Sequence, residues 1–144
     1  MRELPEGKRP EPGPRPVTTG LFEDGADGPR LLAGRCAACA RPHFPAAPVC
    51  PYCAADGCAP IRVGPAARLC LYTAVHSRPP GYRGDVPYGF GVVELDGGLR
   101  IITRLTEADL DHLRPGLAMR LVITPLHTDD GGPVTSYAFR PEKP

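Results

Sequence analysis

Residues 36–53 of the chain read CAACARPHFPAAPVCPYC. The four cysteines of this stretch form two C-x-x-C pairs, Cys36 with Cys39 and Cys50 with Cys53, separated by ten residues. Such a pair places two thiolates on one tight loop, and two loops supply four sulfur ligands at about 2.3 Å from a tetrahedral metal ion. The spacing therefore predicts a zinc ribbon with these four cysteines as the metal ligands.

A four-cysteine site has no open position for water or substrate, so its metal is expected to be structural. It would hold together a proline-rich segment that lacks a hydrophobic core of its own. Iron is an alternative, because tetrahedral thiolate ligation suits both metals. A redox dithiol is a second alternative, disfavoured by the absence of a βαβ pattern. Cys58 is interpreted as a free thiol and Cys70 as a small apolar strand residue.

The chain after residue 60 has the pattern of short β-strands. Residues 68–77, RLCLYTAVHS, alternate so that Leu69 and Leu71 should share one face with Thr73 and Val75. Two β-rich runs around Asp-Gly-Gly predict a hairpin. The five predicted strands cover residues 68–77, 88–95, 99–105, 117–124 and 134–139.

A short helix is expected between the third and fourth strands. Thr106 and Asp109 have the spacing of a helix-capping pair, and Pro115-Gly116 would end the helix after about two turns. Five sequential strands with one such helix predict an all-β protein with an OB-fold, a five-stranded Greek-key barrel. A sandwich or an SH3-like barrel remains an alternative.

The remaining segments complete the predicted domain organisation. Residues 1–16 mix charges with proline and are expected to form a flexible tail. At most a short helical turn near Leu21–Phe22 should precede a turn at residues 24–29 and a strand at 30–34. The predicted units are the tail 1–16, the ribbon with its lead-in 17–60, the barrel 61–140 and a polar tail 141–144.

Composition and charge exclude several classes of function. No apolar run approaches the ~18 residues that a membrane span needs, and no apolar signal segment follows Met1. We therefore expect a cytoplasmic protein, in whose reducing surroundings cysteines favour metal over disulfides. The formal net charge of +1 disfavours a dedicated nucleic-acid binder. No nucleophile-elbow, phosphate-loop or zinc-protease motif occurs, so no catalytic residue is assigned.

Aromatic and cationic side chains gather in and around the loop of residues 78–87. Such a group can stack the bases of single-stranded nucleic acid, hold the adenine and phosphates of a coenzyme, or simply close the mouth of the barrel. All three interpretations stay open from the residues alone. The candidate ligand or partner surface consists of Tyr72, His76, Arg78, Tyr82, Arg83, Tyr88 and Phe90.

Four motifs in order carry a resemblance to a known family: GRCAACARPHFPAAPVCPYC (34–53), LCLYTAVHSRPPGY (69–82), PYGFGVVELDGGLRIITRL (87–105) and LRPGLAMRLVI (113–123). The chain resembles small bacterial and archaeal proteins, often filed as a domain of unknown function, that join a zinc ribbon to an OB-fold. The resemblance covers about residues 30–140. It implies a rubredoxin-like zinc ribbon followed by a five-stranded OB-fold barrel.

The resemblance also implies a function. Members look like non-catalytic accessory subunits that dock on thiolase-like, acyltransferase-like or other acyl-CoA enzymes and help to bind a coenzyme A thioester. Catalysis would then belong to the partner, and the loop from His76 to Tyr88 would lie near the coenzyme or the partner. Members usually carry an aromatic-bearing helix ahead of the ribbon, whereas Leu21-Phe22 is followed here by a turn. The alternatives are a single-stranded nucleic-acid binder and a rubredoxin-like electron carrier.

Overall fold

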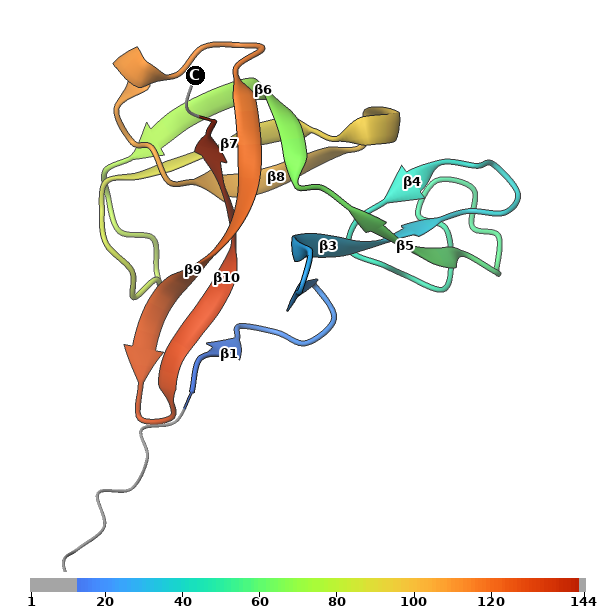
Figure 1. Ribbon diagram of the computed structural model, residues 1–144, viewed down its shortest axis with the longest axis horizontal. Coiled ribbons are helices and arrows are strands. Elements are labelled where there is room, and N and C mark those ends of the chain that lie inside the picture. Colours follow the sequence, from blue (N-terminus) through green and yellow to red (C-terminus); the bar gives the residue numbers. More distant parts are fainter. Residues whose placement is uncertain (1–12, 143–144) are drawn as a thin grey trace, which may run out of the picture.

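A computed structural model of the chain describes residues 13–142 and shows two β-sheets joined end to end (Figure 1). Within these residues the helical segments are single 3-10 turns, with no α-helix. The strands are β1 (Arg15–Pro16), β2 (Phe22–Gly25), β3 (Gly28–Arg35), β4 (Pro42–His43), β5 (Ala59–Val63), β6 (Ala66–Val75), β7 (Tyr88–Glu94), β8 (Arg100–Leu105), β9 (Ala118–Asp129) and β10 (Gly132–Pro141). The 3-10 turns are η1 (Asp96–Gly98) and η2 (Leu110–His112).

The smaller sheet forms the ribbon and is organised around β3. Strand β3 pairs antiparallel with β2, β4 and β5. The predicted strand at residues 30–34 is confirmed within β3. The expected helical turn at Leu21–Phe22 is wrong, because Phe22 begins a strand opposite Leu31 and packs against the core. A β-hairpin half-buries this aromatic ring against the core, whereas one helical turn would leave it without a partner strand.

The larger sheet is a closed five-stranded barrel. Its strands follow the order β9-β6-β7-β8-β10, and β10 returns to pair with β9. Closure also uses a parallel contact between β10 and β8, at Phe139 opposite Leu105. The all-β prediction of a ribbon followed by an OB-type barrel is therefore confirmed, and closure shortens the edges that an open five-stranded sheet would expose.

A β-bulge in β6 corrects the predicted alternation of residues 68–77. Leu69 lies opposite Val93, but Leu71 lies opposite Val92, so Cys70 is an extra residue in the ladder. An extra residue shifts the phase of every side chain beyond it. The prediction that Leu69 and Leu71 share one face is therefore wrong: Leu69 is buried in the barrel, and Leu71 faces outward.

The predicted two-turn helix after β8 is reduced to the single turn η2. The Thr106 amide donates to the Phe139 carbonyl, so this residue still belongs to the barrel wall. Side chains of Glu107 and Asp109 accept from the nearby amides of Asp109 and Asp111. Asp109, rather than Thr106, is thus the N-cap of the turn, which begins three residues later than predicted and is anchored in the core by Leu113.

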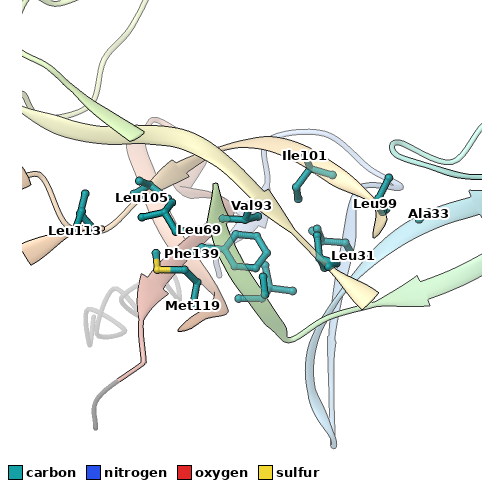
Figure 2. Packing of buried hydrophobic residues seen from close by; sticks show 13 residues of the cluster. Leu31, Ala33, Leu69, Val93, Leu99, Ile101, Leu105, Leu113, Met119 and Phe139 are labelled. Carbon is teal, nitrogen blue, oxygen red and sulfur yellow. The ribbon is translucent and has the colours of Figure 1, made fainter. Parts of the chain in front are cut away.

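The hydrophobic core runs continuously from the barrel into the ribbon. Figure 2 shows the Phe139 ring among Val93, Leu69 and Met119, with Leu31 of β3 at the end nearest the ribbon. All five side chains are less than 2% exposed. Because Leu31 belongs to this cluster, the ribbon and the barrel share one packed interior rather than meeting through a linker.

The pairings of β1, β5 and β10 bear on the predicted domain boundaries, which otherwise remain predictions. Of the predicted tail over residues 1–16, residues 1–12 lie outside the part of the chain that the structure describes. Its last two residues form β1, which pairs parallel with β10 opposite Val134 and Thr135. Strand β5 pairs with β3 as far as Val63, three residues into the predicted barrel. At the other end, Pro141 still pairs with Met119, and residues 143–144 lie outside the described part.

Candidate metal centre

Each cysteine pair lies on a knuckle, a tight loop that folds back on its own first cysteine. In the first knuckle the Ala40 amide donates to the Cys36 carbonyl at 2.9 Å. In the second the Ala54 amide donates to the Cys50 carbonyl at 3.0 Å. Ala40 and Ala54 adopt positive φ angles of 62° and 64°. The same conformation at matched positions shows that the two knuckles are structural equivalents.

Backbone amides point at the first sulfur of each knuckle. The amides of Ala38 and Cys39 donate to Cys36 Sγ at 3.3 and 3.4 Å. The amide of Tyr52 donates to Cys50 Sγ at 3.4 Å. Hydrogen bonds of this kind stabilise a thiolate over a thiol. The backbone of each knuckle therefore favours the thiolate form of its first cysteine, which is the form that binds a cation.

The four sulfur atoms converge on one point between the knuckles. All lie within 4.8 Å of one another. Cys36 Sγ is 3.6 Å from Cys53 Sγ, and Cys39 Sγ is 3.7 Å from Cys50 Sγ. Ideal tetrahedral zinc thiolate geometry places sulfurs about 3.8 Å apart. The predicted ligands are thus brought together at the separation that a tetrahedral ion needs.

The thiols differ in acidity. The amide of Cys39, then that of Ala38, lowers the pKa of Cys36 to about 6. Burial raises the pKa of Cys50, but amide hydrogen bonds outweigh it and leave that pKa lowered. The Ala55 amide lowers the pKa of Cys53, whereas contacts with Cys36 and the other sulfurs raise it overall to about 12. The first sulfur of each knuckle is therefore the more acidic one, and a bound cation would favour the thiolate form of all four cysteines.

The packing around the knuckles fixes their positions. His43 is 2% exposed, and its ring lies against Gly34 of the neighbouring strand. A Cβ atom on Gly34 would be 2.4 Å from His43 Nε2, so only glycine leaves room for the ring. Arg41, after the first knuckle, places its guanidinium 5.3 Å from the ring centroid of Tyr52 in the second. This cation–π contact ties the two knuckles together outside the sulfur cluster.

Two further cysteines lie outside the cluster. Burial, with the neighbouring charge of Cys36, raises the pKa of the Cys58 thiol, which favours its protonated form. Cys70 is the extra residue of the β6 bulge, with its thiol 3.8 Å from the Arg68 carbonyl. Neither belongs to the group of four sulfurs that converge in the described residues.

The residues of the candidate ligand surface do not form one cluster. Tyr72 packs against the hydrophobic core, whereas Phe90 lies on the outer face of β7. Tyr82 and Tyr88 do meet, with ring centroids 4.9 Å apart, and the Tyr82 hydroxyl donates to the Asp85 carbonyl at 3.0 Å. His76, Arg78 and Arg83 are exposed along the same loop. Their role as a ligand or partner surface remains a prediction.

Two family models match the chain and divide it as the two sheets do. The ChsH2 rubredoxin-like zinc ribbon domain matches residues 24–57. The ChsH2 C-terminal OB-fold domain matches residues 61–124. A thiolase subunit from Thauera aromatica, benzoylsuccinyl-CoA thiolase subunit BbsA, is 30% identical over 97% of this chain and 99% of its own length. The chain belongs to the ChsH2/DUF35 family. Its similar proteins include one named as a thiolase subunit and others named as scaffold proteins.

Two other comparisons agree with the family assignment. A DUF35 domain-containing scaffold protein from Pyrococcus furiosus is 26% identical over 78% of this chain and 83% of its own length. A solved structure described as the Ltp2-ChsH2(DUF35) aldolase matches with a TM-score of 0.61 and 28% identity, over 78% of this chain and 84% of that one. Among residues 13–142, no helix has the length and apolar character needed to cross a bilayer.

Proposed function

We propose that this chain is a non-catalytic scaffold subunit that docks on a thiolase- or aldolase-type enzyme in an acyl-CoA-processing complex. The observation that carries the proposal is the closed cluster of four thiols within 4.8 Å of one another. A metal held by four cysteines has no position left for substrate, so it stabilises structure. The reacting groups would then come from a partner. The relatives named as a thiolase subunit and as part of an aldolase support a partner of that class.

We assign structural zinc to Cys36, Cys39, Cys50 and Cys53. The sulfur separations of 3.6 and 3.7 Å suit a tetrahedral ion, and zinc accepts whatever tetrahedral set the protein imposes. Binding such an ion would supply folding free energy to a segment built mostly of turns. A site of four cysteines needs reduced sulfurs, which a reducing compartment maintains, and this supports action in the cytoplasm.

The proposal extends to the coenzyme of the substrate. Tyr82 and Tyr88 line a groove of about 220 Å³ together with Pro87 and Arg104, and Arg83 is exposed on the adjoining loop. Aromatic faces and guanidinium groups suit an adenine ring and phosphates. In this arrangement the scaffold would hold the coenzyme A end of a thioester while the partner carries out the reaction at the acyl end.

The test is co-expression of this chain with thiolase- and aldolase-type subunits from the same organism, one at a time. We expect one of them to elute with the chain as a stable complex in size-exclusion chromatography and to turn over its acyl-CoA substrate faster in the complex. The matched control is the chain with Cys36→Ser and Cys50→Ser, which should not form the complex. Subunits that purify apart from the chain and are fully active alone would exclude the scaffold function.

A further inference from the structure

The outer face of the barrel carries an apolar stripe across three neighbouring strands. Leu71 of β6 lies opposite Val92 of β7, and Val92 lies opposite Ile102 of β8. Leu71 is 67% exposed and Ile102 is 63% exposed. With Phe90 beside them, these side chains line a shallow groove of about 230 Å³. Single apolar side chains scattered over a surface are common and need no explanation. A contiguous row of them across neighbouring strands, as here, indicates an interaction site.

The bulge at Cys70 is what brings Leu71 to this face. Without the extra residue, Leu71 would keep the phase of Leu69 and point into the barrel. Bulges commonly re-aim a side chain next to a functional surface. Here the change of phase moves a leucine from the core to solvent, which costs stability in the isolated chain. Burial by a partner would offset that cost.

The chemistry of the stripe indicates the kind of molecule that covers it. It crosses β6, β7 and β8, and the face of the second and third barrel strands, here β7 and β8, binds ligands in other OB-folds. Its members are mainly aliphatic, whereas single-stranded nucleic acid needs aromatic platforms for stacking. Side chains more than 60% exposed do not enclose a small ligand, which normally has most of its surface buried. A protein surface fits this shape best.

The rim of the stripe is mainly cationic. Arg68 and Arg100 lie at one end with Glu94 between them, and Arg100 pairs with Glu94 at 3.2 Å. Arg104 lies at the other end, where its guanidinium donates to Thr124 Oγ1 at 2.8 Å. Three arginines and one glutamate leave the rim positive. A complementary partner would present an apolar centre bordered by carboxylates.

We propose that the Leu71–Val92–Ile102 stripe docks the partner subunit, through an apolar patch with an acidic rim on that subunit. The proposal rests on the scaffold function proposed above and assigns a surface to it. The aliphatic centre supplies burial, and the arginine rim orients the approach. Association should therefore slow as salt rises, because screening weakens the rim, while dissociation should depend mainly on the stripe.

The test compares single variants Leu71→Ser and Ile102→Ser with the wild-type chain for binding to the purified thiolase- or aldolase-type subunit. Each variant should weaken binding about tenfold or more, chiefly through faster dissociation. Leu110→Ser is the matched control, because Leu110 is 44% exposed on η2 but does not line the groove, so this variant should bind as wild type. Unchanged far-ultraviolet circular dichroism and metal content establish that each variant is folded.

The possible failures are distinguishable. If no such subunit binds the wild-type chain, the scaffold function is excluded and the docking surface with it. If a subunit binds the wild type and both stripe variants equally, only the docking surface is excluded. If both variants bind the subunit normally but lower acyl-CoA turnover in the complex, the stripe contacts the substrate, and its assignment to a protein partner is overturned.

Discussion

At the residue scale, the metal ligands depend on neighbours that the C-x-x-C spacing does not reveal. Ala40 and Ala54 adopt left-handed backbone conformations, which cost an L-residue about 1–2 kcal/mol. The cost is tolerated because this conformation turns the backbone back toward the first cysteine of each knuckle and points the preceding amides at that cysteine's sulfur. The spacing predicted the four ligands, but alanine has no preference that would predict the strained turn after them.

Gly34 and His43 provide a prediction at the same scale. Gly34→Ala should destabilise the ribbon by about 1–3 kcal/mol, because the new methyl group would overlap the buried ring of His43. Denaturant unfolding followed by tyrosine fluorescence measures the change. In a His43→Ala background the same substitution should cost far less, since the ring is gone. Equal costs in both backgrounds would show that the close approach has no energetic consequence.

At the element scale, the sequence predicted strands well and their faces less well. The positions of β6 to β10 follow from alternation and turn residues, since both are local properties of the chain. The bulge at Cys70 depends on how β6 pairs with β7. The alternation of residues within one strand carries no information about that pairing. The two-turn helix was wrong for a related reason: Thr106 bonds to Phe139 of β10, so the helical turn begins only at its actual cap, Asp109.

The pairing of β1 with β10 gives a pH-dependent prediction. Arg15 donates to the Asp129 carboxylate, and this hydrogen bond, with one from the Gly131 amide, lowers the pKa of Asp129 to about 2. Because the folded-state pKa is depressed, the contact should be complete above about pH 4 and lost as the pH falls through about 2. Asp129→Asn should speed hydrogen exchange of the Val17 amide, which donates to the Thr135 carbonyl, several-fold at neutral pH.

The same exchange measurement contains its own control. In the wild-type protein, protection of the Val17 amide relative to the barrel amides should decline only at acid pH, after correction for intrinsic exchange. In the Asp129→Asn protein that relative protection should be low throughout and independent of pH. A pH profile shared by both proteins would mean that the Arg15–Asp129 pair does not hold β1 in place.

At the scale of the whole molecule, cysteine spacing and strand count were sufficient to predict a ribbon and a barrel. They did not predict that Leu31 of the ribbon completes the core of the barrel, because that contact joins segments far apart in the sequence. Nor did they predict the outer stripe, since its three side chains meet only through strand register. The candidate metal ligands were the predictable part of the site, because two short motifs encode them locally.

On the function proposed here, one four-cysteine zinc centre makes the ribbon a rigid part of a docking subunit. The most direct measurement is elemental analysis of the purified chain, with its absorption spectrum and its unfolding curve before and after chelation. We predict one zinc per chain, no colour, and loss of the ribbon when zinc is removed or when Cys36 and Cys50 are changed to serine. Metal-free protein with unchanged unfolding, or coloured protein holding iron, would contradict the account.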